Sequence, residues 1–332
     1  MPATPDATVR YATRHPAFLE NAFYRKILDL HVSSLGIGTY LGAIDDATDI
    51  AYTDALIAAG EGGINFFDCA INYRNQRSER SIAVALRQLQ REEIVVCTKA
   101  GFLTPGAVPD SLDADDVVGG MHSLAPRFVA DQIERSRANL GVDTLDVFYL
   151  HNPETQLSFR TRAEFDARIR RTFTQLEVLV DRRKIHWYGV AAWDGFRRKG
   201  ALSLPRLAEI ALEEGGSEHH FRFIQLPFNL GMVEAFVDRP ESVLEAAGRL
   251  GIVAVASATL LQSRILSQMP DAAQTLLPGL ESDAQRAIQF TRSTPGITVA
   301  LVGMGRREHV LHNLGVANVP PATRDQYLRF YK

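Results

Sequence analysis

Eight short apolar segments alternate with amphipathic segments along this chain of 332 residues, and no other feature restricts its fold as strongly. Several of the apolar segments are almost continuously hydrophobic, which is typical of strands that are buried on both faces. The segments between them have apolar residues at helical spacing. The predicted strands are residues 33–40, 64–70, 93–100, 144–151, 185–193, 222–229, 251–258 and 297–304. The predicted helices are residues 48–59, 78–89, 128–140, 173–180, 205–212 and 242–250.

Repeated strand–helix units in a chain of this length predict an α/β fold, a single (β/α)8 barrel. The alternative is a doubly wound open sheet, which normally has a G-x-G-x-x-G turn straight after its first strand. The segment LGIGTYLG has Gly36, Gly38 and Gly42, and this spacing does not fit that turn. We therefore expect residues 31–332 to form the barrel and residues 1–30 to be an N-terminal extension that caps the barrel floor.

One connection is much longer than the others. Residues 101–126 follow the third predicted strand and are rich in Gly, Pro and Asp. Connections of this length are uncommon in compact domains and are usually functional or mobile. Because it follows a strand, this loop is expected over the carboxyl face of the barrel, where barrel active sites lie.

Charge and composition exclude several classes of function. The 36 basic and 39 acidic residues give a net charge of −3, without the basic excess of a nucleic-acid-binding or membrane-surface protein. Cys69 and Cys97 lie in apolar strands and are expected to be reduced, buried thiols. The N-terminal segment has no signal-like apolar core, and no run reaches the roughly 18 apolar residues of a membrane span. We expect a cytoplasmic protein with a small-molecule substrate; its oligomeric state is left open.

The histidines do not suggest a metal centre. His219 and His220 are adjacent in a charged loop, and neither has a second ligand at a useful spacing. We therefore predict no metal site.

Four polar residues stand at the carboxyl ends of three consecutive predicted strands. Asp68 and Tyr73 follow INFF, Lys99 ends EIVVCTKA, and His151 ends TLDVFYLH. A lysine within such an apolar segment must be paired or functional, because burial of an unpaired ammonium is costly. Asp68 is its expected partner from the neighbouring strand. Parallel strands bring their carboxyl ends together, so the four side chains are expected to converge.

This set of side chains suits proton transfer to a carbonyl oxygen. A phenol has a pKa of about 10, and a neighbouring ammonium lowers that value toward the working range. A carboxylate behind the lysine keeps the lysine charged, and an imidazole can orient a carbonyl by a hydrogen bond. The set therefore suits protonation of an alkoxide as hydride reaches the carbonyl carbon.

The order Asp68, Tyr73, Lys99 and His151, with tyrosine five residues after aspartate, resembles the aldo-keto reductase superfamily. The segments LGIGTY, NYRNQRSERSIAVAL and IQLPFNL also resemble its motifs, so the resemblance covers nearly the whole chain. It implies a (β/α)8 barrel that binds NADP(H), less often NAD(H), without a Rossmann fold. It further implies an NAD(P)-dependent oxidoreductase acting on an aldehyde, ketone or aldose, with Tyr73 as general acid and base.

The resemblance also implies a set of cofactor contacts. Gln225 would hold the nicotinamide carboxamide, and a helix beginning near Arg306 could offer its N-terminus to phosphate. Arg306 and Arg307 could contact a 2′-phosphate in place of the family's lysine–serine pattern. The implied cofactor residues are Gly38, Thr39, Tyr40, Asp68, Gln225, Ser257, Gly303, Arg306, Arg307 and Asn313.

The chain departs from the family pattern in the implied nicotinamide pocket. Ala191 and Ala192 stand where many members have a serine–asparagine pair, and Ala256 stands where an aromatic side chain often stacks on the nicotinamide. Trp193 or Phe228 could fill the space instead.

Two other functions are compatible with these residues. One is an aldolase that uses Lys99 as a Schiff-base nucleophile. The other is a regulatory barrel that binds cofactor with little turnover, which the three alanines suggest.

Overall fold

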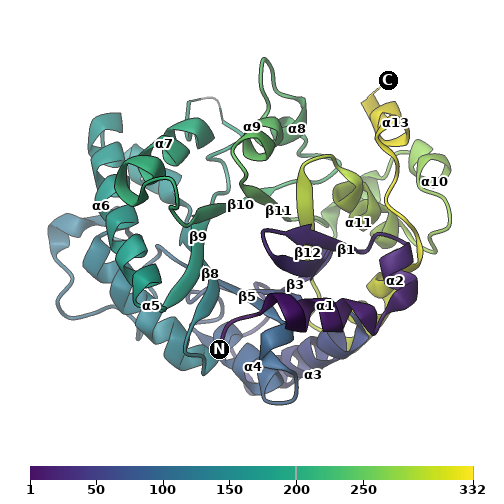
Figure 1. Cartoon of the computed structure of the whole chain (residues 1–332), viewed down its shortest axis with the longest axis horizontal. Coiled ribbons are helices and arrows are strands. Elements are labelled where there is room, and N and C mark those ends of the chain that lie inside the picture. The colour runs from purple at the N-terminus through teal and green to yellow at the C-terminus, as the bar shows by residue number, and fades with distance from the viewer. Residues whose placement is uncertain (199, 332) are drawn as a thin grey trace.

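A closed barrel of eight parallel strands forms the centre of the computed structural model, which describes residues 1–198 and 200–331 (Figure 1). Strands adjacent along the barrel are also consecutive in the chain, and the last strand pairs with the first. This arrangement confirms the predicted (β/α)8 fold. The barrel strands are β3 (Leu35–Gly38), β4 (Phe66–Asp68), β5 (Val95–Ala100), β8 (Leu145–His151), β9 (Ile185–Ala191), β10 (Phe221–Pro227), β11 (Val253–Ser257) and β12 (Ile297–Gly303).

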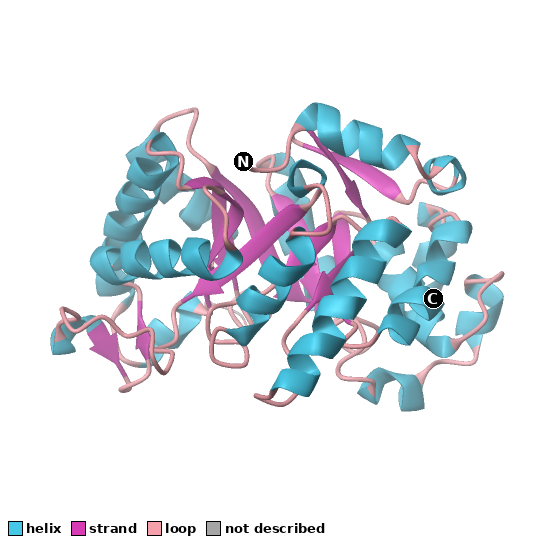
Figure 2. Cartoon of the chain, turned by 90° about the horizontal axis from the view of Figure 1, so that it is seen from below, coloured by secondary structure: helices cyan, strands magenta, loops and turns pink. Residues whose placement is uncertain are grey.

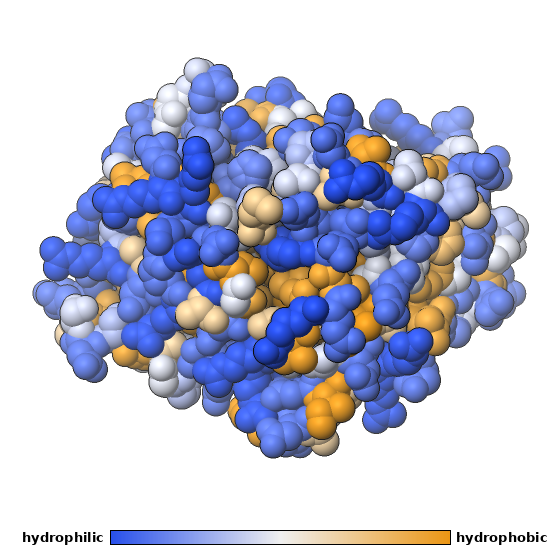
Figure 3. Space-filling model, turned by 60° about the horizontal axis from the view of Figure 1, so that its bottom comes forward, coloured by the Kyte–Doolittle hydropathy of each residue, from blue (hydrophilic) through white to orange (hydrophobic). Residues whose placement is uncertain are grey.

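Helices surround the barrel (Figures 1 and 2). Their buried apolar side chains share one cluster with side chains of the strands. The face of the molecule in Figure 3 is mostly hydrophilic, with hydrophobic patches between. Within the described residues, no helix has the length and apolar composition needed to cross a membrane. The main helices are α3 (Asp46–Gly62), α4 (Arg77–Leu86), α5 (Pro126–Leu140), α6 (Arg162–Asp181), α7 (Leu204–Gly215), α9 (Val243–Arg249), α11 (Asp283–Ser293) and α12 (Arg307–Asn313). Shorter helices are α1 (Pro5–Thr13), α2 (Pro16–Glu20), α8 (Glu234–Val237), α10 (Ala272–Leu276) and α13 (Arg324–Tyr327).

Two of the main helices differ from the predicted ones, and the five shorter helices were not predicted. Helix α6 begins at Arg162, well before the predicted residue 173, because Thr161 and Glu164 form a capping box at its start. Helix α11 was not predicted. Its buried face includes polar side chains such as Gln285, Gln289 and Arg292, so the sequence lacks a clear apolar stripe there.

The N-terminal segment lies at the amino end of the barrel. Strands β1 (Tyr24–Ile27) and β2 (Leu30–Ser33) form an antiparallel hairpin, so the predicted strand 33–40 is divided between β2 and β3. Ile27, Leu30 and Val32 share one buried cluster with side chains of the barrel interior such as Val147. The opposite, carboxyl end is therefore the open end of the barrel.

Asp146 connects this N-terminal segment to two neighbouring elements. Its fully buried carboxylate accepts hydrogen bonds from the amides of Ala3 at 2.6 Å and Val96 at 2.8 Å. It also forms an ion pair with Arg91 at 2.8 Å. The carboxylate of Asp146 in strand β8 thus binds Ala3 near the N-terminus, Val96 of strand β5, and Arg91 in the segment before β5.

The long loop after β5 lies over the carboxyl face, as predicted, and is ordered by a small hairpin of β6 (Val117–Val118) and β7 (His122–Ser123). Phe102 forms a β-bridge with His122. The His122 ring bonds the backbone oxygen of His151 at 2.8 Å and the Gln156 side chain at 2.9 Å. The loop is therefore attached to the end of strand β8.

We predict that Asp146→Ala destabilises the protein by about 3–5 kcal/mol, because it leaves Arg91 and two buried amides without their partner. Unfolding in urea, followed by circular dichroism, measures this change. Asp143→Ala is the control, since Asp143 is exposed and pairs with the N-terminal amine on the surface. Equal stability of the two variants would contradict the proposed role of Asp146.

Candidate active site

The four predicted catalytic residues converge at the carboxyl end of the barrel. Asp68 is the last residue of β4, Lys99 lies near the end of β5, and His151 is the last residue of β8. Tyr73 lies in the turn that follows β4. Because β4, β5 and β8 are adjacent parallel strands, their ends deliver these side chains to one region.

Asp68 and Lys99 form a buried ion pair. The Lys99 Nζ donates to Asp68 Oδ1 at 2.5 Å and to the backbone oxygen of Cys69 at 2.8 Å. The other carboxylate oxygen of Asp68 accepts from Gln225 Nε2 at 2.7 Å. Lys99 is fully buried. Its ammonium is thus held in one place by two acceptors.

Burial has the largest single effect on the pKa of Lys99 and lowers it, but the charge of Asp68, the charge of Tyr73 and the hydrogen bond to Asp68 together outweigh burial, so the net pKa lies above its ordinary value. Burial also raises the pKa of Asp68, and Lys99 and then Gln225 offset this rise in part. With the ammonium 2.5 Å from the carboxylate, the pair is ionised at neutral pH and supplies a fixed positive charge. Removal of either member would leave the other as an unpaired buried charge, which is strongly destabilising.

Tyr73 lies against this positive charge. Lys99 Nζ is 4.9 Å from the centre of the Tyr73 ring. The ring packs edge-on against Tyr40 at 4.9 Å and His151 at 5.8 Å between centroids. Three neighbours therefore determine where the phenol points.

The pKa of Tyr73 differs from the expectation. Burial raises it to about 12, and Lys99 only partly offsets this rise. Lys99 does lower the pKa of Tyr73, as predicted, but the prediction that the net pKa falls toward the working range is wrong, because desolvation is the larger effect. Tyr73 is consequently a neutral phenol at neutral pH, with a proton to donate.

His151 is uncharged. Burial, and then the charge of Lys99, lower its pKa well below the ordinary value. Phe102 packs edge-on against its ring at 5.2 Å between centroids. Among the described residues its buried Nδ1 has no hydrogen-bond partner. A neutral imidazole next to a phenol can orient a carbonyl oxygen without repelling the ammonium.

These side chains border a cavity of about 620 Å³. Asp68, Tyr73 and His151 line it, whereas Lys99 does not. Seven of the ten implied cofactor residues also line it, namely Gly38, Thr39, Tyr40, Asp68, Gln225, Ser257 and Gly303. Across the described residues, no cluster of His, Cys, Asp or Glu side chains is arranged to hold a metal ion.

The other three implied cofactor residues lie outside this cavity. Arg306 caps helix α12 and Arg307 begins it, and both side chains are exposed. Asn313 ends the same helix and is buried. Any contact of these residues with a cofactor therefore requires a ligand that extends beyond the cavity.

The alanines occupy different environments. Ala191 and Ala192 line the cavity, but Ala256 does not. Ala256 belongs to the hydrophobic cluster that the strands form with the surrounding helices. The neighbouring Ser257 faces the cavity instead. Of the two proposed aromatic replacements, Trp193 lines the cavity and Phe228 is buried elsewhere, stacked on Phe290.

Several lining residues were not identified from the sequence. Three of them are next to predicted catalytic residues or strand ends, namely Asn72, Phe102 and Asn152. Their position in the sequence could have indicated that they line the cavity. Residues 258–264 also line the cavity. In this segment Ala258 and residues 261–263 have positive φ without being glycine, so no glycine pattern marks the turn.

Known proteins resemble this chain in sequence and in fold. The model of the Aldo/keto reductase family matches residues 34–275. A D-threo-aldose 1-dehydrogenase from Pseudomonas sp is 31% identical over 157 residues, 45% of each chain. A putative voltage-gated potassium channel subunit beta from Schizosaccharomyces pombe is 27% identical over 170 residues, 50% of this chain and 44% of the relative. The matches thus span about half the length of these curated relatives.

Solved structures extend the similarity to the whole barrel. An aldo/keto reductase from Klebsiella pneumoniae, in complex with NADP and acetate, has a TM-score of 0.67 and 20% identity. The match covers 91% of each chain. At this identity the match supports the fold.

We predict that Lys99→Met lowers the free energy of unfolding by about 3–5 kcal/mol, because Asp68 is left as an unpaired buried charge. The double variant Lys99→Met/Asp68→Asn should lose clearly less than the sum of the two single changes, since the uncompensated charge is gone. Urea unfolding of the four proteins measures this coupling. Additive losses would show that the pair is not ionised.

Proposed function

Because the chain belongs to the aldo/keto reductase family, we propose that it transfers hydride between a nicotinamide cofactor and a small carbonyl or alcohol substrate. NADP(H) is the expected cofactor, with NAD(H) as the alternative, and an aldehyde, ketone or aldose is the expected substrate. The convergence of a neutral phenol, a buried ion pair and a neutral imidazole on one cavity carries this proposal.

Tyr73 acts as the acid in carbonyl reduction. Its pKa of about 12 keeps the proton on the phenol until negative charge develops on the substrate oxygen. Lys99 then stabilises the phenolate that proton donation leaves behind, because its ammonium is fixed 4.9 Å from the ring. In alcohol oxidation the same phenolate takes the proton back.

His151 orients the substrate oxygen. Its ring faces Tyr73, and both residues line the same cavity. A neutral ring can share a hydrogen bond with that oxygen and leaves proton donation to Tyr73.

The cavity fits a polar, extended cofactor. Asn72 Oδ1 and Thr259 Oγ1 are buried, line the cavity, and have no hydrogen-bond partner among the described residues. Gly303 also lines it, and a Cβ added there would meet no atom within 4 Å. Gln225 donates its Nε2 to Asp68, which leaves its carbonyl oxygen as the group that accepts from a carboxamide. When bound, the nicotinamide supplies or accepts the hydride.

The burial of Lys99 argues against the aldolase. An aldolase lysine must be reached by the substrate carbonyl and must lose its proton to attack it. Lys99 is fully buried, does not line the cavity, and has a raised pKa.

The regulatory barrel is the second candidate. The similarity to a potassium channel subunit beta and the alanines at 191 and 192 favour it. Tight binding of NADPH without turnover of any aldehyde, ketone or aldose would support this alternative over the reductase.

We predict that Tyr73→Phe lowers kcat for carbonyl reduction by about 10²- to 10⁴-fold, because the general acid is lost. The Kd of NADPH should change little, since the phenylalanine ring keeps its packing against Tyr40 and His151. Nicotinamide absorbance measures kcat. Unchanged turnover in this variant would refute the mechanism.

We predict that the double variant Arg306→Ala/Arg307→Ala weakens NADPH binding at least about 10-fold and NADH binding much less, because only NADPH carries the 2′-phosphate. Tryptophan fluorescence can measure both affinities, because the chain has two tryptophans and Trp193 lines the cavity. Arg324→Ala, an exposed arginine of α13, is the control for loss of charge. If the double variant weakened the binding of NADPH and NADH equally, the two arginines would not contact the 2′-phosphate.

A further inference from the structure

The turn that carries Tyr73 has an unusual backbone. Arg74, Asn75 and Gln76 follow the tyrosine directly and have φ values of 48°, 51° and 71°. Residues with a Cβ rarely adopt this left-handed conformation, and glycine is the usual residue where it is required. Three consecutive non-glycine residues therefore need external contacts that hold them in place.

Arg74 supplies the main contact. Its side chain is almost fully buried, and its guanidinium forms an ion pair with Asp49 of helix α3. The same guanidinium lies 4.7 Å from the ring centre of Tyr52, also in α3, and donates to Ser81 Oγ at 3.2 Å. Arg74 thus ties the residue after Tyr73 to two neighbouring helices.

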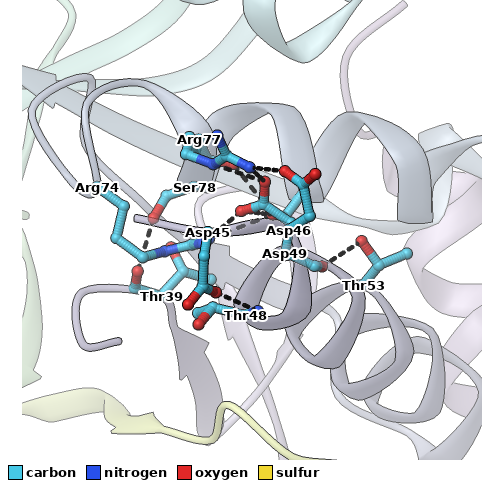
Figure 4. Close-up of polar contacts among 10 residues, drawn as sticks. Thr39, Asp45, Asp46, Thr48, Asp49, Thr53, Arg74, Arg77 and Ser78 are labelled. Carbon is cyan, nitrogen blue, oxygen red and sulfur yellow. Dashed lines mark hydrogen bonds and ion pairs between the residues drawn. The ribbon is translucent and has the colours of Figure 1, made fainter. Parts of the chain in front are cut away.

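Asp49 is itself held in place. Arg77 Nε donates to the second carboxylate oxygen of Asp49 at 2.7 Å, and another Arg77 nitrogen pairs with the exposed Asp46 (Figure 4). The partner of Arg74 is therefore a positioned carboxylate and not a free surface charge.

The far end of the turn is also fastened. The amide of Gln76 donates to the Ile71 oxygen at 2.8 Å, and its side-chain oxygen accepts from Asn139 at 3.1 Å. Asn139 also donates to the buried Glu79 at 2.8 Å. The strained turn is thus bounded on both sides, with Tyr73 at its start.

We propose that Arg74 is a positioning residue for Tyr73: its ion pair with Asp49 and its packing on Tyr52 hold the turn so that the phenol stays between Tyr40 and His151, beside Lys99. Arg74 does not line the cavity, so it acts through the tyrosine and not on the substrate. This inference rests on the proposed function, in which the Tyr73 oxygen must meet a substrate oxygen.

The first test is Arg74→Gly. Glycine adopts the backbone conformation without strain, so the variant should fold, but the side-chain anchor is lost. We expect kcat to fall about 10- to 100-fold, because small displacements of a reacting group cost this much. The Kd of NADPH should stay within about 3-fold, since the residues that line the cavity are unchanged. If Arg74 only stabilised the fold, its loss would not lower kcat while leaving the Kd of NADPH nearly unchanged.

The second test is Asp49→Asn, which keeps Arg74 and removes its charged partner. We expect a fall in kcat, and we expect Arg74→Gly/Asp49→Asn to be no worse than Arg74→Gly alone, because both changes break one contact. Arg74→Lys should restore part of the activity, since it keeps the charge. The matched control is Asp46→Asn, which removes an exposed carboxylate of the same cluster. Among the described residues Asp46 pairs with Arg77 alone, so kcat should stay within about 2-fold.

Amide hydrogen exchange provides a readout that does not depend on turnover. In Arg74→Gly and Asp49→Asn, exchange should rise across residues 69–78 and not in Asp46→Asn. Wild-type kcat in a folded Arg74→Gly variant would refute the proposal, as would unchanged exchange. If Arg74→Gly does not fold, the same two measurements on Asp49→Asn test the proposal, and wild-type kcat or unchanged exchange in that variant would refute it. If the wild type shows no turnover at all, the proposed function fails. Amide hydrogen exchange in the variants then still tests whether Arg74 holds the turn that carries Tyr73.

Discussion

The buried ion pair between Lys99 and Asp68 is the interaction on which the site depends. Its two charges lie on adjacent parallel strands, so they meet only when β4 and β5 are in register. Once formed, the pair determines the charge next to the phenol, adds to burial in keeping His151 neutral, and accepts a hydrogen bond from Gln225 on the opposite side of the barrel. These contacts between side chains of β4, β5 and β10 therefore require the closed strand order.

The pair also explains why the phenol needs no unusually low pKa. In this structure burial outweighs the ammonium, so Tyr73 remains protonated. In the proposed mechanism the ammonium instead stabilises the phenolate that proton donation leaves behind. A fixed charge contributes to catalysis when it is aimed at the negative charge that develops in the transition state, and it does not need to ionise the resting acid.

The sequence allowed prediction of the barrel and of its four convergent residues for clear physical reasons. Strands buried on both faces are almost continuously apolar, and a lysine, aspartate or histidine at such a strand end stands out. The sequence was less informative where side chains, and not the backbone pattern, determine conformation. Helix α11 buries glutamines and an arginine, and the segment around residues 258–263 turns without glycine.

The environments of single side chains were equally hard to derive. Ala256 and Ser257 are neighbours, yet one packs against helices and the other faces the cavity, because adjacent strand residues point in opposite directions. The net pKa of Tyr73 could not be derived either, since it is a balance between desolvation and a charge whose distance only the fold determines.

The attachment of His122 to the backbone of His151 has a consequence for evolution and design. His122 belongs to the long loop after β5, which is the kind of surface segment that families exchange to change substrate preference. Here that loop also supplies a hydrogen bond to the strand end that presents the imidazole. A replacement loop must therefore provide an equivalent hydrogen-bond donor to the backbone oxygen of His151. The position of His122 is thus less free to vary than the rest of the loop.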